Sequence, residues 1–298
     1  MKIRLAITAA ILSVFLCQNV YSSPSAWREL EEGKRLFEQG ELGEALQRFQ
    51  KAISLSGTYP EGEFWIGRVF EAEGEYALAI EQYKKAYTDR QYLLISDDQF
   101  DIMYHLAAIH YHLKEYGSYE DDLEKILSTQ SRTPVLDRNL MPAMIATFKN
   151  RGIDRYFILY RAREEEKVGA FGDIGIFYYK TGRYTDATMN LLMAITIPVS
   201  VIVDYMRNDE PEYEYYEMGL FLEDTGKSET MTEYLVSSGF FRYLYYLGSS
   251  LYAEGEKSRA EEIWRIVSRN RMESQYRSMA AAQLREPKIE PIIVYPKP

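Results

Sequence analysis

Apolar residues recur along most of this 298-residue chain at spacings of three, four and seven, a pattern typical of amphipathic helices. The clearest stretch spans residues 26–90, where two similar segments follow one another at an offset of 34 residues. Each segment predicts two helices separated by a glycine, Gly40 in the first and Gly74 in the second. The pattern therefore predicts an all-α fold built from a series of helical hairpins.

The two segments agree at positions where residue size matters. Small residues such as Gly67 and Ala79 are expected where the two helices of a hairpin approach most closely. Gly74 is expected to take a positive φ just past a helix end, which glycine does at little cost. The matched pairs are Gly33 and Gly67, Gly40 and Gly74, Leu42 and Tyr76, Ala45 and Ala79, Phe49 and Tyr83, and Ala52 and Ala86.

This period and these positions resemble the tetratricopeptide repeat (TPR). The resemblance implies a right-handed TPR-type α-solenoid, in which neighbouring hairpins bury each other's apolar faces. Following the inter-helix position along the chain predicts about seven hairpins over residues 26–270. That position is held by Gly40, Gly74, Lys114, Gly152, Gly182, Gly226 and Gly255.

The repeats differ in how well they match. The first, second, fifth and seventh match well. In the third, Tyr119 stands where a small residue is expected, and the fourth predicts only a helical hairpin around Gly152. The sixth is expected to lose part of its second helix. Residues 196–211 are extra to the pattern, and we expect a short separate helix at 199–208 after Pro198.

The last 28 residues do not continue the repeats. Residues 271–285 predict one more helix, which would cap the last hairpin. Residues 286–298 form a proline-rich tail in which helix cannot persist. The tail is either without fixed structure or an extended segment that docks on a groove of its own chain or of a partner.

The first 22 residues have the pattern of an export signal. Lys2 and Arg4 precede an apolar run at residues 5–16, and compact residues follow up to Ser22. The run is shorter than the roughly 20 residues of a membrane helix. Removal of residues 1–22 is one expectation, and a lipoprotein signal acylated at Cys17 is the other. Leu16 suits a lipoprotein signal poorly, so the pattern favours simple cleavage and predicts an exported protein of the periplasm or cell envelope.

Charge narrows the class of partner. The chain has a net charge of −10, and without Lys2 and Arg4 it has 33 basic and 45 acidic residues, a net charge of −12. A strongly acidic protein is a poor match for nucleic acid or an anionic membrane surface. We therefore expect a protein or peptide partner, with a membrane tether only if Cys17 is lipidated.

Patterns that would indicate catalysis or metal binding are weak. Thr225 to Ser228 resembles the end of a phosphate-binding loop, but Phe221 stands where that motif needs its first glycine. His105, His110 and His112 fall in one predicted helix, where His110 is expected to pack inward and the other two share a face without a third ligand. We predict no metal, no cofactor and no enzymatic activity.

The resemblance also implies a site. In the family, the first helix of each hairpin lines a concave groove, and tyrosine and arginine dominate many protein interfaces. For any one of the tyrosines, packing in the core remains an equal alternative. The register also places further residues in the groove: Trp27, Leu30, Lys34, Phe37, Phe64, Glu71, His112, Lys180 and Tyr213. The predicted groove residues are Arg68, Tyr104, Tyr111, Tyr179, Tyr216, Arg242, Tyr245 and Tyr252.

These observations predict a non-catalytic, exported TPR scaffold or adaptor that binds a protein or extended peptide. The alternative is an accessory subunit of an envelope assembly or transport machine, docked through another face. An enzyme is the least favoured class.

Overall fold

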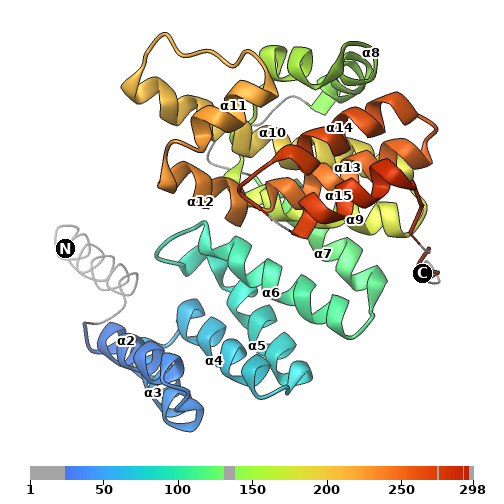
Figure 1. Ribbon diagram of the computed structural model, residues 1–298. Helices are drawn as coiled ribbons and strands as arrows, with labels where there is room; N and C mark the ends of the chain where they lie inside the picture. The colour runs from blue at the N-terminus through green and yellow to red at the C-terminus, as the bar shows by residue number, and fades with distance from the viewer. Residues whose placement is uncertain (1–23, 131–137, 274, 291, 295–298) are drawn as a thin grey trace, which may run out of the picture. The chain divides into compact units, whose positions relative to one another are not determined.

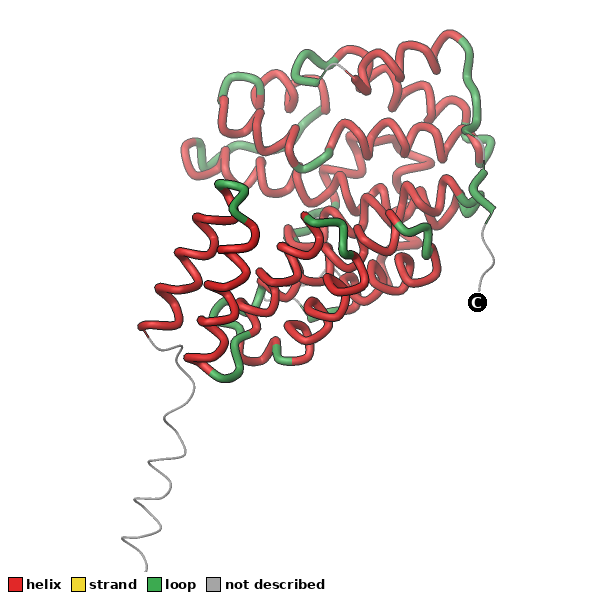
Figure 2. The backbone as a smooth tube through the Cα atoms, turned by 90° about the horizontal axis from the view of Figure 1, so that it is seen from below, coloured by secondary structure: helices red, strands yellow, loops and turns green. Residues whose placement is uncertain are grey.

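A computed structural model describes residues 24–130, 138–273, 275–290 and 292–294 (Figure 1). These residues form fourteen α-helices and three short 3-10 helices, and none of them is in a strand (Figure 2). The chain divides into two compact units, an N-terminal unit up to Glu115 and a C-terminal unit from Tyr116. The fold class is the all-helical TPR-type α-solenoid that the repeats predict, and the unit boundary falls inside the third predicted repeat.

The N-terminal unit contains two complete hairpins and the first helix of a third. Helix α2 packs against α3 and α4 against α5, and α3 and α5 each pack against the helix that follows. A 3-10 turn, Arg90–Tyr92, precedes the last helix. The helices are α2 (Pro24–Glu38), α3 (Leu42–Ser56), α4 (Pro60–Ala72), α5 (Tyr76–Thr88) and α6 (Asp98–His112).

In the four well-matched hairpins, a glycine of the first helix lies against the side chain found sixteen residues later on the second helix. The close approach predicted at Gly67 is therefore present, but the side chain that fills the space is the ring of Tyr83. Ala79, four residues earlier on the same helix, is fully buried. A larger residue at any of these glycines would meet that side chain. The pairs are Gly33 and Phe49, Gly67 and Tyr83, Gly175 and Leu191, and Gly248 and Trp264.

The inter-helix turns follow the predicted register with one exception. Lys114 takes the left-handed conformation, with φ of 61°, at the place where other repeats have glycine. Gly226 is different: its φ is −66°, so this turn does not need a glycine. A positive φ is confirmed at the remaining predicted positions, Gly40, Gly74, Gly152, Gly182 and Gly255.

The C-terminal unit is held together by contacts within and between two helix pairs. Helix α9 packs along α10, α13 packs on α14, and α10 also contacts α13. Helix α15 packs against α14, and it begins at Gln275. The helices are α7 (Tyr116–Ser128), α8 (Met141–Leu159), α9 (Val168–Lys180), α10 (Tyr184–Asp209), α11 (Met218–Thr225), α12 (Glu229–Ser237), α13 (Phe240–Ala253), α14 (Lys257–Arg269) and α15 (Gln275–Arg285), with 3-10 turns at Arg138–Leu140 and Glu165–Lys167.

The weak fourth repeat corresponds to α8, which is interrupted at Gly152. The backbone there has φ of 85° and ψ of 176°, so two helical arms meet at this residue. The rings of Phe148 and Tyr156, one from each arm, lie edge to face with 6.0 Å between their centroids. In the sixth repeat the second helix, α12, is short, as expected, and the first helix, α11, is short as well.

Helix α10 corrects the prediction of a short separate helix at residues 199–208. It runs for 26 residues, and residues 199–208 belong to it and form no separate helix. A proline within a helix costs about 3 kcal/mol, but nearly every side chain of α10 from Ala187 to Val203 is buried, and this burial outweighs the loss. The hydroxyls of Thr196 and Ser200 also donate to main-chain oxygens of the same helix, at 2.6 and 2.7 Å.

Length and composition alone would allow α10 to cross a membrane, and among the described residues it is the one helix that meets both criteria. Its most apolar 18-residue window has a mean hydropathy of 1.7, and 83% of that window is buried inside the protein.

Candidate functional site

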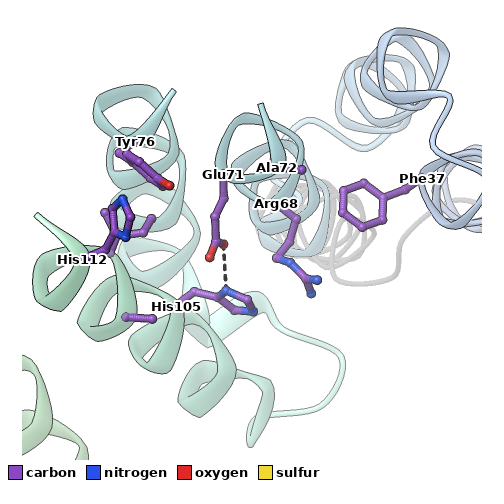
Figure 3. A pocket seen from close by; sticks show the side chains of 9 residues that line it. Phe37, Arg68, Glu71, Ala72, Tyr76, His105 and His112 are labelled. Atoms are coloured by element: carbon purple, nitrogen blue, oxygen red, sulfur yellow. Dashed lines mark hydrogen bonds and ion pairs between the residues drawn. The ribbon is translucent and has the colours of Figure 1, made fainter. Parts of the chain in front are cut away.

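A groove of about 460 Å³ opens on the N-terminal unit between α2, α4 and α6, with Tyr76 of α5 at one side (Figure 3). These are the first helices of three consecutive repeats, the surface on which the TPR resemblance predicts ligand binding. We call it the N-terminal groove. Its lining residues are Phe37, Arg68, Glu71, Ala72, Tyr76, His105, Ala108, Ile109 and His112.

The repeat period explains why these side chains meet. Phe37, Glu71 and His105 are each 34 residues apart, so they occupy one equivalent position in three successive repeats. Arg68 lies three residues before Glu71, and His112 lies seven after His105, spacings that keep side chains on one face of a helix. Stacking of the repeats therefore brings the three faces together along the groove.

A hydrogen-bonded network fixes the middle of the groove. Glu71 Oε2 lies 2.8 Å from His105 Nδ1 (Figure 3). The same oxygen accepts a hydrogen bond of 2.5 Å from the hydroxyl of Tyr83. Burial raises the pKa of Glu71, but the hydrogen bonds from His105 and Tyr83 and the charge of Arg68 lower it further, so the net pKa lies below its usual value. The Glu71 carboxylate therefore stays ionised and orients the His105 ring.

Arg68 lies in the groove beside two aromatic rings. Its guanidinium carbon lies 5.5 Å from the ring centroid of Phe37 and 5.4 Å from that of Trp65, within range of cation–π attraction. Within the described ranges, no carboxylate lies within ion-pair distance of Arg68. The groove thus combines aromatic surface with a cation that a ligand's acidic group can reach.

Four predicted groove residues besides Arg68 lie outside the N-terminal groove without being deeply buried. Tyr104 is partly buried and Tyr111 is 40% exposed, both on α6 but not among the residues that line the groove. Tyr216 is 73% exposed in the segment before α11, which begins only at Met218. The ring of Tyr252 packs against Trp264, with 5.7 Å between centroids.

Three others belong to the interior or edge of the C-terminal unit. Tyr179 and Tyr245 are only 2% and 3% exposed, so neither offers an open aromatic surface. Arg242 is ion-paired with Asp173 at 3.2 Å. Tyr179 and Tyr245 are therefore not part of an accessible groove surface, because the core of this unit and the C-terminal tail cover them.

Two residues that line the groove were not predicted as groove residues. His105 was considered only as a metal ligand, and Tyr76 only as the counterpart of Leu42 in the repeat. The signal that could have identified His105 is its 34-residue spacing from Glu71 and Phe37. His110 is buried, as predicted, and the described ranges contain no cluster of three or more potential metal ligands.

Comparison with known proteins agrees with this architecture. Residues 30–93 match the family model described as tetratricopeptide repeat. The match covers most of the hairpin α2–α3 and all of the hairpin α4–α5, so this part of the chain is similar to tetratricopeptide repeats.

Two relatives are similar over most of the chain. An uncharacterised protein of Treponema pallidum (strain Nichols) is 27% identical over 247 residues, which cover 79% of this chain and 66% of the relative. An uncharacterised protein of Borreliella burgdorferi is 22% identical over 282 residues, 84% of this chain and 87% of the relative. The chain thus spans just under two thirds of the first relative's length.

Among solved structures, the chain is similar to YrrB, described as a TPR protein with an unusual peptide-binding site. The two share 14% identity over 94% of this chain and 98% of YrrB, with a TM-score of 0.44. The TPR domain of P58(IPK) is 16% identical over 88% of this chain and 66% of that domain, with a TM-score of 0.29.

Proposed function

We propose that the protein is a non-catalytic scaffold or adaptor that binds a protein or extended peptide in its N-terminal groove. The observation that carries this proposal is the convergence of three successive repeats on one hollow. Arg68 stands there over aromatic rings and within reach of a ligand. The similarity to tetratricopeptide repeats also supports a role in protein interaction, because repeat solenoids present extended concave binding surfaces.

The chemistry of the groove suggests what the ligand carries. The partly exposed rings of Phe37 and Tyr76 offer contact to an apolar side chain, and Arg68 offers its guanidinium to a carboxylate. The ring of His105, held through Nδ1 by Glu71, has its other nitrogen for a further hydrogen bond. The preferred ligand is a segment with an acidic residue next to an apolar one.

A random peptide library selected on the full chain tests this proposal. Enriched peptides should pair an acidic with an apolar residue, and calorimetry should show that Arg68→Ala weakens their binding by about 2 kcal/mol, as expected for an interface hot spot. Arg265→Ala is the matched control, because Arg265 is an exposed arginine of α14, paired with Glu261 and outside the groove. Equal affinity of the wild type and Arg68→Ala would reject the groove as the binding site.

The alternative, an accessory subunit docked through another face, has one observation in its favour. The turn before α6 exposes Tyr92, Leu94 and Ile95, and Leu94 is 79% exposed. If selected ligands lose affinity with Leu94→Ser but not with Arg68→Ala, the docked-subunit function is preferred.

We also propose that the protein is exported to the periplasm or cell envelope. The support is the order of positive residues, apolar run and compact residues over positions 1–22, which lie outside the described residues. Intact mass of the protein from its native host decides between the two routes. A chain starting at Ser23 supports simple cleavage, an acylated start at Cys17 supports a lipoprotein, and retention of Met1 would contradict both.

A further inference from the structure

The first part of the C-terminal tail lies on the C-terminal unit without regular secondary structure. The main chain of residues 286–290 and 292–294 forms hydrogen bonds with α9 and α15, and the Glu290 side chain contacts α13 through Tyr246. This matches the expectation of an extended segment docked on its own chain. The contacts show how the surface recognises a peptide.

The side-chain amide of Gln283 in α15 accepts one hydrogen bond from the main chain of Lys288 and donates another to it. The Lys288 N–H donates to Gln283 Oε1 at 2.7 Å, and Gln283 Nε2 donates to the Lys288 carbonyl at 3.0 Å. The same Nε2 lies 3.2 Å from the hydroxyl of Tyr245, which holds the amide in place. Gln283 is buried, so its amide depends on these partners.

Two groups at the end of α9 continue the series. The Glu290 N–H donates to the hydroxyl of Tyr179 at 3.0 Å, and the Ile293 N–H donates to the carbonyl of Lys180 at 2.7 Å. The carbonyl of Lys180 belongs to the last turn of α9, where helix geometry leaves acceptors without an intrahelical donor. Three fixed polar groups therefore meet three main-chain N–H groups of an extended segment.

The side chain of Glu290 is recognised as well. Its carboxylate accepts a hydrogen bond from Tyr246 and faces the charge of Lys180. Burial raises the pKa of Glu290 more than these two groups lower it, so the position accepts a glutamate whose charge is only partly compensated. The surface thus selects a hydrogen-bonding side chain at this place, in addition to the main-chain pattern.

We propose that this surface is a second peptide-binding site, independent of the N-terminal groove. It takes an extended segment of a partner protein with main-chain N–H groups at the places of Lys288, Glu290 and Ile293 and a glutamate at the middle place. The chain's own tail occupies the site until such a segment displaces it.

The tether makes the tail a strong competitor. A short linker gives a tethered segment an effective concentration on the order of millimolar. A free peptide of the same sequence therefore binds poorly to the intact chain, and a partner must add contacts beyond those that the tail makes.

The test uses the full chain and a fluorescein-labelled peptide with the sequence of residues 286–294. A tail variant carries Glu290→Lys and Ile293→Pro, which place a positive charge near Lys180 and remove the N–H that Lys180 accepts. Fluorescence anisotropy should show that the tail variant binds the peptide about tenfold or more tightly than the wild type. A peptide with the same two changes should not bind.

Variants of the surface locate the binding. In the tail-variant chain, Tyr179→Phe removes one hydroxyl and keeps the ring, and it should weaken binding of the peptide about tenfold. Tyr252→Phe, a tyrosine outside the tail contacts, is the control and should change nothing. If Tyr179→Phe does not fold, the peptide with Ile293→Pro alone serves the same purpose and must lose affinity.

Several results would overturn the proposal. Equal binding of the peptide to the wild type and the tail variant would make the tail ordinary packing. Binding that ignores both Tyr179→Phe and the Ile293→Pro peptide would place the peptide elsewhere. A dimeric wild type that becomes monomeric in the tail variant would show that a second copy supplies the tail.

Discussion

The ring of Tyr83 occupies the space that a β-carbon on Gly67 would need. A Cβ built on Gly67 would lie 2.6 Å from Cε1 of Tyr83, far inside normal contact. The ring cannot move away easily, because it is fully buried and its hydroxyl donates to Glu71. The packing of this hairpin and the network of the N-terminal groove are therefore linked through one side chain.

Gly67→Ala should lower the free energy of unfolding by about 1–3 kcal/mol through overpacking. The matched control is Gly43→Ala: Gly43 lies in α3 with no neighbour within 4 Å of its Cβ position, and this change should stabilise the protein by about 0.5 kcal/mol. Denaturant unfolding measures both. Similar effects of the two substitutions would contradict the close approach.

Lys114→Gly should raise the free energy of unfolding by about 0.5–1 kcal/mol, because glycine relieves the strain of a left-handed backbone at φ of 61°. Glycine also loses more conformational entropy on folding than lysine, and this loss offsets only part of the gain. The control Lys84→Gly places glycine at an exposed, helical lysine of α5 and should lower stability by about 1 kcal/mol. Thermal or denaturant melts of the two variants should therefore shift in opposite directions.

The repeat register could be predicted because its determinants are local. Gly67 and Gly175 need no knowledge of the rest of the fold, since the glycine and the large side chain sixteen residues later belong to one hairpin. The same locality explains why Lys114 could be placed in a turn. At Gly226 the expectation that the turn needs a glycine was wrong, because a turn with φ of −66° accepts any residue.

The features that could not be predicted from the sequence depend on contacts between distant segments. Residues 199–208 were expected to form a separate helix, and only the packing of α10 against α9 and α13 shows why they continue the helix before Pro198. Tyr179 was predicted in the groove with core packing as an equal alternative, because helix periodicity cannot tell that a tail more than 100 residues later covers it. His105 lies in the groove because two repeats stack, which its own helix does not reveal.

Tyr179→Ala should now be a stability change. The groove hypothesis expected weaker binding with the fold intact, whereas removal of a ring that is 2% exposed should lower the free energy of unfolding by about 3–5 kcal/mol. Tyr111→Ala, at a side chain that is 40% exposed, should change it by less than about 1 kcal/mol. Circular dichroism melts of the two variants test the difference, and similar losses would contradict the burial of Tyr179.

The ionised Glu71 should contribute a pH-dependent part of stability. Because its pKa in the folded protein lies below the usual 4.5, this contribution is present above pH 4.5 and is lost as the pH falls through the lower folded value. The difference in free energy of unfolding between the wild type and Glu71→Gln should therefore shrink between pH 5 and about pH 3. The control Glu73→Gln changes an exposed carboxylate at the end of the same helix, and a shrinkage of equal size there would assign the effect to general charge repulsion.

Trp65 stands at the meeting point of the first two hairpins and contacts the groove arginine. Its ring packs on Phe37 and Phe49 and lies under the guanidinium of Arg68. Only two other tryptophans exist, of which Trp264 is fully buried in the other unit and Trp27 is largely exposed. The fluorescence of Trp65 should therefore report ligand binding without any label, since a ligand that draws Arg68 away from the indole would change the Trp65 emission. A Trp27→Phe background would remove the emission of the largely exposed Trp27 from that signal.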